Sequence, residues 1–534
     1  MPRKDNYSKE HISFAKKIIQ EINSGLINNS KTLEDRSFFW SKFFKLKEMP
    51  SHPFIFSFVS EKEKENKKFI SLLSIKPTRS LSGVQVVAVM LPPFACPGKC
   101  IYCPNQFDGK IAPKSYTGFE PSTLRAQRLN YDSFEIVSNR IKQLDLTGHR
   151  AEKIELIFQG STFTCLNKKK QEIIVKKSLE AIVEKKCSSF DKVKFLAETS
   201  KRRVVGITFE TRPDYCNEKD IEQMLYLGGT RVELGVQHAD DLVYKKIQRG
   251  HSVEDVINST SRLKDSSFKV LYHLMPGLPG TTPKKDLKNF KKIFKDPNFK
   301  PDMVKFYPCL VIKNSELYNE WKKGRFNPIS EKDAIYVLSE IQKEIPPWVR
   351  VMRINRDIPG NIISAGIKTT NLRQVIDEYM KKNGIVSKDI RSREAGLLSR
   401  DKEIDYSKAK IKRIFYESSS GEEVFISMES KDALFGFVRL RNPANPFIKS
   451  IKSKTSLIRE LHVYGKALSL GKKDEESTQH RGFGKELMDE AEKIAREKFD
   501  SKKIAVISGL GVRNYYKKQF NYKIEEPFVS KILK

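Results

Sequence analysis

The chain has 534 residues, of which 39% are hydrophobic, and a chain of this length is expected to form at least two domains. No segment approaches the roughly 20 uncharged apolar residues of a membrane span, and the N-terminus MPRKDNYSKEH lacks the apolar core of a secretory signal. We therefore expect a cytoplasmic protein without membrane contact. Lys and Arg total 99 against 66 Asp and Glu, a net charge of +33. This excess favours a polyanionic partner such as nucleic acid, although a lysine-rich proteome would also produce it.

Residues 1–75 are basic, and the apolar spacing of 8–22 predicts a helical region. It either binds RNA or forms a solvated helical surface.

A cysteine motif follows the apolar run 84–90. Cys96, Cys100 and Cys103 are spaced C-x3-C-x2-C. Three thiolates can hold three irons of a 4Fe-4S cluster and leave the fourth iron open, whereas structural zinc and ferredoxin-type clusters normally take four protein ligands. The motif, including Tyr102, resembles the radical S-adenosylmethionine (SAM) signature, in which SAM binds the open iron. Half of a zinc knuckle is the alternative.

Residues 76–315 alternate apolar, β-branched runs with helical patterns. The predicted strands are 84–90, 154–158, 204–209, 231–236, 268–275 and 303–312. Such alternation predicts a parallel sheet covered by helices, and six units make a partial (β/α)6 barrel. Active-site residues of barrels lie at the C-terminal ends of the strands, which is where the cysteine motif falls.

Polar residues follow several of these strands and could contact SAM. The candidates are Gln159, Glu210, Arg212, Glu233 and Gln237. Helix capping and turn formation are the alternative. Residues 316–404 resemble a connecting region, in which 350–356 (RVMRINR) suits an RNA-facing or interdomain surface.

Residues 405–534 have a different pattern, with four predicted strands, then a helix at about 483–498, a strand and a short helix. Gln479-His-Arg-Gly482-Phe-Gly484 precedes the first of these helices, and glycines there let backbone N–H groups approach a pyrophosphate. The Q-x-x-G-x-G pattern resembles the acetyl-CoA loop of GNAT acetyltransferases, which predicts an α+β GNAT-like domain.

Both halves together resemble the catalytic subunit of Elongator, in its archaeal type. The matching segments are KPTRSLSGVQVVAVM, CIYCP, SYTGFEPSTLRA, ITFETRPDYC, RVELGVQ, DMVKFYP, RDIP, RELHVYG, HRGFGKELMDEAEKIARE and KIAVISGLGVRNYYKK. They run in order from about residue 76 to the C-terminus.

The resemblance implies an acyltransferase-type radical SAM tRNA uridine carboxymethyltransferase. A SAM-derived 5′-deoxyadenosyl radical would abstract hydrogen from the acetyl methyl of acetyl-CoA. The resulting carbon radical would add to C5 of the wobble uridine, and thioester hydrolysis would leave 5-carboxymethyluridine. The implied partners are tRNA and either a second copy of the chain or Elongator-like accessory subunits.

The resemblance also assigns residues. Cys96, Cys100 and Cys103 match the cluster ligands, and Lys153 matches a lysine at the acetyl-CoA site. Tyr516 matches a CoA-contacting tyrosine with Tyr515 beside it, and a tyrosine hydroxyl could orient the thioester or donate a proton. Core packing is the alternative for one of the pair. The acetyl-CoA segment comprises Glu460, Leu461, His462, Val463, Gln479, Gly482, Phe483, Gly484 and Lys485.

The sequence departs from the family in two places. The segment 383–396 (NGIVSKDIRSREAG) has no cysteine, so we predict no zinc. The Gly-Gly-Thr of the family is here 159–162 (QGST), which leaves the SAM contacts at that turn open. Two other functions are considered: a protein lysine acetyltransferase that uses the GNAT half alone, and an RNA-binding scaffold with a vestigial barrel, against which the intact set of three cysteines argues.

Overall fold

The structure is a computed structural model that describes residues 8–60, 62–73, 83–104, 109, 111–399, 404–431, 433–452, 454–464 and 482–534. The chain forms two compact units. One comprises Met1–Gln85 with Ser138–Lys153, and the other comprises Val86–Val137 with Ile154–Lys534. In the described residues, no helix combines the length and the apolar character of a membrane span.

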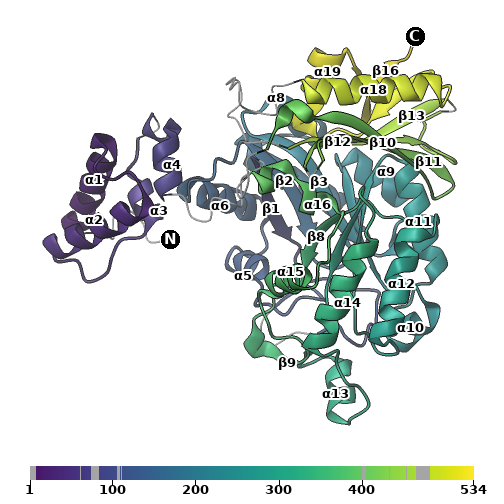
Figure 1. Cartoon of the computed structure of the whole chain (residues 1–534), viewed down its shortest axis with the longest axis horizontal. Coiled ribbons are helices and arrows are strands. Elements are labelled where there is room, and N and C mark those ends of the chain that lie inside the picture. Colours follow the sequence, from purple (N-terminus) through teal and green to yellow (C-terminus); the bar gives the residue numbers. More distant parts are fainter. Residues whose placement is uncertain are drawn as a thin grey trace. The chain divides into compact units, whose positions relative to one another are not determined.

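The N-terminal unit contains α1 (Lys9–Ser24), α2 (Ser30–Phe43), α3 (His52–Phe56) and α4 (Lys67–Leu73) (Figure 1). Phe14, Ile18 and Ile22 recur every fourth residue of α1, so they share one face, and all three are fully buried. They pack in one apolar cluster with Leu33 and Phe69. This unit therefore has a hydrophobic core of its own.

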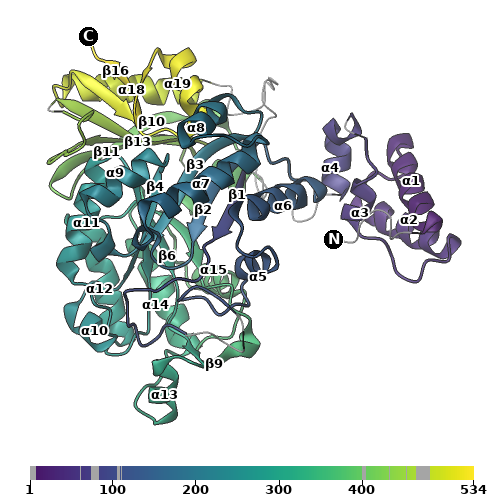
Figure 2. The ribbon, with the colours of Figure 1, turned by 180° about the vertical axis from the view of Figure 1, so that it is seen from behind.

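The larger unit begins with a seven-stranded sheet in the order β1-β2-β3-β4-β5-β6-β8. Adjacent strands from β3 to β8 pair in parallel, and helices cover the outer face of the curved sheet (Figures 1 and 2). This arrangement confirms the predicted partial barrel. The strands are β1 (Val84–Met90), β2 (Lys153–Gln159), β3 (Arg203–Thr211), β4 (Arg231–Gln237), β5 (Lys269–Leu274), β6 (Met303–Phe306) and β8 (Arg350–Ile354).

The helices between these strands follow from amphipathic spacing and N-terminal caps. Ser252 caps α11 and forms a capping box with Asp255, and Thr282 caps α12, so first-turn N–H groups of both helices are satisfied. The helices are α5 (Pro121–Arg128), α6 (Ser133–Leu146), α7 (Lys168–Val183), α8 (Phe190–Thr199), α9 (Glu218–Tyr226), α10 (Asp241–Lys246), α11 (Val253–Asp265), α12 (Pro283–Lys295), α13 (Glu316–Lys322) and α14 (Glu331–Glu344).

One sequence prediction requires correction in this region. The run 303–312 is not one strand: it divides into β6 and β7 (Val311–Ile312), and β7 pairs with β9 (Ile363–Ala365) in a separate sheet. Pro308 lies between them and cannot donate to a strand ladder. The segment 350–356 contains β8, which pairs with β6 and buries Val351 completely. Arg350 donates to the hydroxyl of Tyr464 in the C-terminal domain at 2.9 Å, which agrees with the interdomain alternative.

Between β9 and the C-terminal domain lie α15 (Leu372–Lys382), α16 (Ile390–Arg393) and α17 (Ala395–Leu398). The range 316–404 therefore contributes two strands, β8 and β9, and several helices to the larger unit.

The C-terminal domain is α+β, with a sheet in the order β10-β11-β12-β13-β14-β16-β15. The helix α18 packs Leu487, Met488 and Ala491 against this sheet, and all three are fully buried. The elements are β10 (Lys410–Ser418), β11 (Gly421–Glu429), β12 (Leu434–Asn442), β13 (Thr455–Val463), α18 (Phe483–Glu497), β14 (Lys503–Val506), α19 (Arg513–Phe520), β15 (Lys523–Glu525) and β16 (Phe528–Ile532).

This domain packs against the edge of the barrel at which the strands begin. A Cβ at Gly509 would lie 2.3 Å from the carbonyl oxygen of Val205, near the start of β3, so only glycine allows this approach. Arg459 donates to the carbonyl of Phe268, immediately before β5, at 2.7 Å and to Asp302, immediately before β6, at 2.8 Å. The cysteine motif follows the end of β1 and therefore lies at the opposite edge.

Buried charges hold this junction together. Arg439, Arg441 and Arg459 have no exposed side-chain surface, and their carboxylate partners include Asp302 and Glu423. Burial raises the pKa of Glu423, but Arg459, Lys264 and Arg441 outweigh it and bring the pKa to about 2. Each of these ions is therefore compensated, as burial of charge requires.

Candidate functional site

The loop that carries the three cysteines is anchored by backbone hydrogen bonds. The N–H of Ile101 donates to the carbonyl of Ile247 at 3.1 Å, and the Ile101 carbonyl accepts from Leu317 at 2.8 Å. Cys100 and Cys103 are buried and Cys96 is half-buried. The structure therefore brings the three thiols into one loop at the C-terminal edge of the barrel.

Two buried arginines lie against this loop. Arg249 donates to Sγ of Cys100 at 3.3 Å and to the carbonyl of Gly235. Arg212 is held by Asp214 through two hydrogen bonds of 2.9 and 2.7 Å. A Cβ at Gly98 would lie 2.4 Å from Nη1 of Arg212, so a larger residue there would displace this guanidinium from the loop.

The thiols of this loop are strongly perturbed. The pKa of Cys100 falls to about 4, mainly through the hydrogen bond from Cys103 and, against the opposing effect of burial, through the charge of Arg249. The hydrogen bond to Cys100 and burial raise the pKa of Cys103 well above its ordinary value. One thiolate is therefore stabilised at neutral pH, as a metal-binding cysteine requires.

These residues fit a cluster with three protein ligands. Nη1 of Arg212 and Nε of Arg249 are buried and have no hydrogen-bond acceptor among the described residues, and a buried donor normally has one. An anionic iron–sulfur cluster on the three thiolates would supply acceptors and negative charge for both guanidiniums. Hydrogen bonds to cluster sulfurs also tune its potential.

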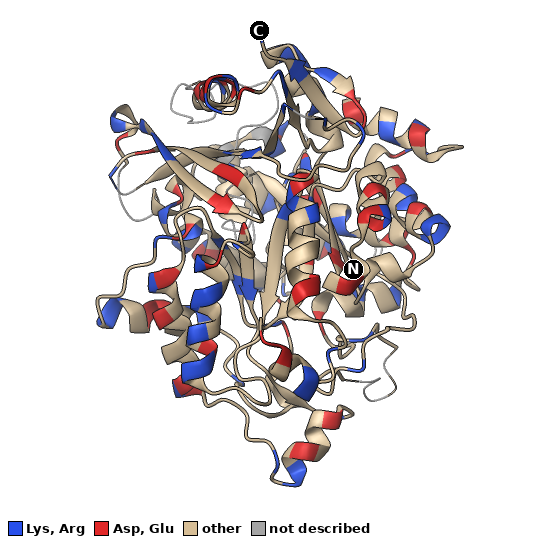
Figure 3. Cartoon of the chain, turned by 90° about the vertical axis from the view of Figure 1, so that its right-hand side faces the viewer, with Lys and Arg blue, Asp and Glu red and all other residues tan. Residues whose placement is uncertain are grey.

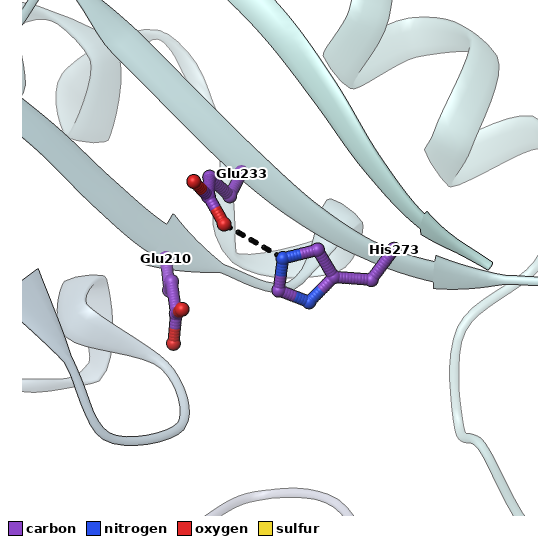
Figure 4. A group of neighbouring side chains, drawn as sticks. All are labelled: Glu210, Glu233 and His273. Atoms are coloured by element: carbon purple, nitrogen blue, oxygen red, sulfur yellow. Dashed lines mark hydrogen bonds and ion pairs between the residues drawn. The ribbon is translucent and has the colours of Figure 1, made fainter. Parts of the chain in front are cut away.

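A second group of ionisable side chains lies inside the barrel. Glu210 projects from β3, Glu233 from β4 and His273 from β5, and their ligand atoms lie within 4.8 Å of one another (Figure 4). Nε2 of His273 lies 2.7 Å from Oε2 of Glu233, and Lys305 of β6 donates to the same oxygen. Tyr116 donates to Glu210 at 3.2 Å.

The two glutamates have opposite electrostatic environments. Burial raises the pKa of Glu210, and the charge of Glu233 raises it further. Burial also acts to raise the pKa of Glu233, but Lys305 and His273 outweigh it and hold that pKa well below its ordinary value. Because the Lys305 ammonium already neutralises Glu233, this group does not resemble a metal site and instead pairs an ionised carboxylate with one that binds a proton readily.

The other SAM candidates end up near this edge. Gln159 ends β2, and its carbonyl accepts from Leu91 at 2.7 Å. Gln237 ends β4 in a left-handed conformation, with φ of 69°. Arg212 lies beside the cysteine loop, whereas Glu233 lies deeper in the barrel and is fully buried. The five SAM assignments remain predictions.

The glycine turn of the C-terminal domain has the geometry of an anion site. Gly482 precedes α18 with φ of 82°, and no side chain caps this helix. The N–H groups of Lys485 and Glu486 bond to the Gly482 carbonyl, which leaves those of Phe483 and Gly484 pointing out of the first turn. Such a turn binds phosphate groups readily. Gln479 lies outside the described residues.

The strand β13 offers a free backbone edge beside this turn. Its parallel pairing with β14 covers only Thr455–Ile458, whereas its antiparallel pairing with β12 continues to Val463. The backbone of 460–463 therefore has polar groups on one side without a strand partner, and these could bond to the amides of a pantetheine arm. Glu460 accepts from Arg439 at 2.8 Å.

The two adjacent tyrosines have different environments. A Cβ at Gly484 would lie 3.1 Å from the Tyr515 hydroxyl and 3.7 Å from Val463, so these three predicted residues meet. Tyr515 is 38% exposed, whereas Tyr516 is 5% exposed and packs in the apolar cluster with Phe520. Tyr516 therefore has the core environment, and Tyr515 is the better placed of the two to contact a ligand at the glycine turn.

Lys153 is the first residue of β2. It therefore lies at the strand edge opposite to the cysteine loop, which is the edge at which the C-terminal domain packs against β3, β5 and β6. Its assignment to the acetyl-CoA site remains a prediction.

Several residues of this site were not predicted from the sequence. Arg249 and His273 lie outside the segments that match the family, whereas Tyr116 and Lys305 lie within SYTGFEPSTLRA and DMVKFYP but were not singled out. The only local signal is position: His273 and Lys305 stand on predicted strands whose other residues are mainly apolar. A polar residue inside such a strand indicates a barrel interior.

The comparisons with known proteins agree with this architecture. The Radical SAM superfamily matches residues 90–291, and the Radical_SAM C-terminal domain matches residues 301–382. A tRNA uridine(34) acetyltransferase of Methanocaldococcus infernus is 48% identical over 493 residues, which cover 91% of this chain and 92% of the relative. Elongator complex protein 3 of Saccharomyces cerevisiae is 38% identical over 505 residues, 92% of this chain and 90% of the relative.

A solved structure of archaeal M. infernus Elp3, with an N-terminal deletion of residues 1–46, has a TM-score of 0.76 and 44% identity. The match covers 85% of this chain and 100% of that chain. The order of the two domains, the cysteine loop and these identities have one explanation. The chain belongs to the family of radical SAM proteins that contains the tRNA uridine(34) acetyltransferases and Elongator complex protein 3.

Proposed function

We propose that this protein modifies the wobble uridine of tRNA as a radical SAM enzyme and uses acetyl-CoA to add a carboxymethyl group at C5. One observation carries the proposal: a single compact unit contains both a three-cysteine loop and a CoA-type glycine turn. Two guanidiniums beside the loop have donors without an acceptor in the described residues. The net charge of +33 suits an RNA substrate, and relatives named tRNA uridine(34) acetyltransferase support the choice of base.

In this proposal, the residues that hold the cluster and those that hold acetyl-CoA lie at opposite edges of the barrel. Cys96, Cys100 and Cys103 would hold a 4Fe-4S cluster, and Arg212 and Arg249 would balance its charge. With SAM bound, such a cluster would supply the radical chemistry that removes a hydrogen atom from an unactivated C–H bond. At the other edge, the glycine turn would hold the CoA pyrophosphate, and the free edge of β13 would align the pantetheine arm.

The separation of these edges has a chemical consequence. The seven residues of β4 span about 20 Å, so an acetyl group held at the glycine turn would be separated from the cysteine loop by at least the length of the barrel strands. Arg231, Glu233, His273 and Lys305 line that interior from β4, β5 and β6. We propose that the acetyl group reaches the uridine through this polar interior and that Glu210, whose pKa is raised by burial, exchanges a proton with the reacting base.

The test is anaerobic reconstitution with iron and sulfide, followed by incubation with SAM, acetyl-CoA and tRNA. Mass spectrometry of the digested tRNA should detect 5-carboxymethyluridine, and 5′-deoxyadenosine should form. Unchanged tRNA, with the iron and sulfide content of the protein verified, would contradict the proposal.

Matched cysteine variants separate this function from protein lysine acetylation by the C-terminal domain alone. Cys100→Ser should lose both bound iron and modified nucleoside. Cys187→Ser is the control, because Cys187 is also buried but lies between α7 and α8, away from the loop. Acetyl transfer to a peptide that persists in Cys100→Ser, with no tRNA product in the unaltered protein, would favour the alternative.

A further inference from the structure

A cavity of about 960 Å³ lies at the C-terminal edge of the barrel, between α10 and α12. Its lining includes His238, Ala239 and Asp240 after β4 and Gly280 and Thr281 before α12. These segments follow the ends of β4 and β5, at the edge that holds the cysteine loop, and the cavity continues from there along α12 to Lys295. Nothing in the proposed chemistry at the cysteine loop or the glycine turn uses it.

The cavity is rich in lysines that have no carboxylate partner. Lys246, Lys285, Lys288 and Lys292 are exposed lining residues, and none forms an ion pair within the described part of the chain. Lys291 and Lys295, which also line the cavity, pair with Glu344 at 3.0 and 3.1 Å. Basic and acidic residues are otherwise interspersed over this side of the molecule (Figure 3).

The aspartates of the lining already have backbone partners. Asp240 accepts from the N–H of Leu242 at 2.9 Å and caps α10. Asp241 accepts from the N–H of Val253 at 2.8 Å. Both carboxylates are thus engaged by the fold, and the lysines are left to face solvent.

A buried histidine, His238, is among the lining residues of the cavity. His238 is 2% exposed, and neither ring nitrogen has a hydrogen-bond partner; its closest carboxylate oxygen, on Asp286, lies 3.5 Å away. The backbone beside it is fixed, because the Asn289 side chain bonds both the N–H and the carbonyl of Ala239, at 3.1 and 3.0 Å.

The lysines of α12 form a row. Lys285, Lys288 and Lys292 are three and four residues apart, so they share one helix face with about 5–6 Å between neighbouring Cβ atoms. The opposite face buries Phe290, Ile293 and Phe294. A row of unpaired ammonium groups beside a cavity suits a chain of phosphates better than a single compact anion.

We propose that this cavity binds the sugar–phosphate backbone of the RNA whose base enters the barrel at the cysteine loop. The inference rests on the proposed function. Contacts to phosphate carry no sequence information, but they set the position of the RNA on the protein. The cavity would therefore orient tRNA rather than select it.

The first test compares two double variants. Lys285→Ala with Lys288→Ala should weaken tRNA binding and reduce the slope of log Kobs against log salt concentration by about 2, because each lost phosphate contact lowers it by about 1. Lys185→Ala with Lys186→Ala is the matched control, because these exposed lysines follow α7 at the edge where the strands begin. An unchanged slope in the first variant would overturn the proposal.

The second test measures lysine acetylation by a chemical reagent, with mass spectrometry, in the presence and absence of tRNA. Lys246, Lys285, Lys288 and Lys292 should be protected, whereas Lys185 and Lys186 should not. If millimolar pyrophosphate protects these lysines and bound tRNA does not, the cavity is a small-anion site and the proposal is wrong. Failure of the proposed function is a different result: tRNA protects the lysines, yet no modified nucleoside forms.

Discussion

The guanidinium of Arg249 donates a hydrogen bond to Sγ of Cys100 across 3.3 Å, although 149 positions separate the two residues in the chain. Arg249 also bonds to the carbonyl of Gly235 in β4, and its own carbonyl accepts from Arg212 at 2.9 Å. It therefore connects the cysteine loop to β4 and to the second guanidinium. This contact fixes the cysteine loop to the strands of the barrel.

We predict that Arg249→Met lowers cluster retention. A hydrogen bond from a charged donor contributes about 1.5–3 kcal/mol, which corresponds to roughly a ten- to hundredfold loss. Arg249→Lys keeps the charge but not the planar fork of donors, so it should recover only part of this loss. Iron content after gel filtration and the low-temperature electron paramagnetic resonance signal measure the effect. Equal iron content in all three proteins would show that the contact does not support the cluster.

We predict opposite stability effects for the two glutamates in the barrel. Glu233→Gln leaves Lys305 buried without its carboxylate and should lower the free energy of unfolding by about 3–5 kcal/mol. Glu210→Gln removes a carboxylate whose ionisation is opposed by burial, so it should be neutral or stabilising at pH 7. Urea denaturation of both variants tests this, and a larger loss in Glu210→Gln would contradict it.

The pH dependence of unfolding follows from the directions of these pKa shifts. Glu210 has a raised pKa in the folded state, so its contribution is present at low pH and is lost as the pH rises through that pKa. Glu233 has a lowered pKa, so its contribution is present above the unfolded-state pKa and is lost as the pH falls through the folded-state value. In Glu233→Gln, the loss of stability on acidification should therefore be smaller than in the unaltered protein.

We predict that substitution of Tyr515 affects acetyl-CoA binding, whereas substitution of Tyr516 affects the stability of the fold. Tyr515→Ala should weaken acetyl-CoA binding with little change in unfolding, because Tyr515 is partly exposed beside Gly484. Tyr516→Ala should lower the free energy of unfolding by about 3–5 kcal/mol, as for other buried aromatic residues. Calorimetric titration with acetyl-CoA and thermal denaturation measure the two effects. An acetyl-CoA affinity unchanged in Tyr515→Ala would exclude the contact.

We predict that Gly482→Ala destabilises the turn before α18. Gly482 has φ of 82°, a conformation that costs other L-residues about 1–2 kcal/mol. No atom lies within 4 Å of a Cβ built at Gly482, so strain rather than a clash would cause the effect. Acetyl-CoA affinity should fall together with stability. Gly396→Ala is the control, because its φ is not positive and it lies in α17. It should leave acetyl-CoA affinity unchanged and should not lower stability, since alanine favours a helix over glycine.

Local signals account for much of the fold. The alternation of β-branched runs with amphipathic segments indicated the partial barrel, because side-chain periodicity depends on residues only a few positions apart. The spacing of Cys96, Cys100 and Cys103 indicated the loop, and the rule that parallel strands end at one edge indicated its location. The arginines of 350–356 indicated an RNA-facing or interdomain surface, but they concealed the buried Val351 and Ile354 of a strand.

By itself, the sequence determined the order of the two domains, the cysteine loop and the glycine turn, since each is a short segment with its own pattern. Only the tertiary structure decided which edge of the barrel the C-terminal domain covers, that Arg249 meets Cys100, and that Tyr515 rather than Tyr516 faces the turn. Those outcomes depend on contacts between residues far apart in the chain, such as Arg459 with Asp302. Residue type alone does not specify such partners, because packing and charge compensation select them only when the whole chain is folded.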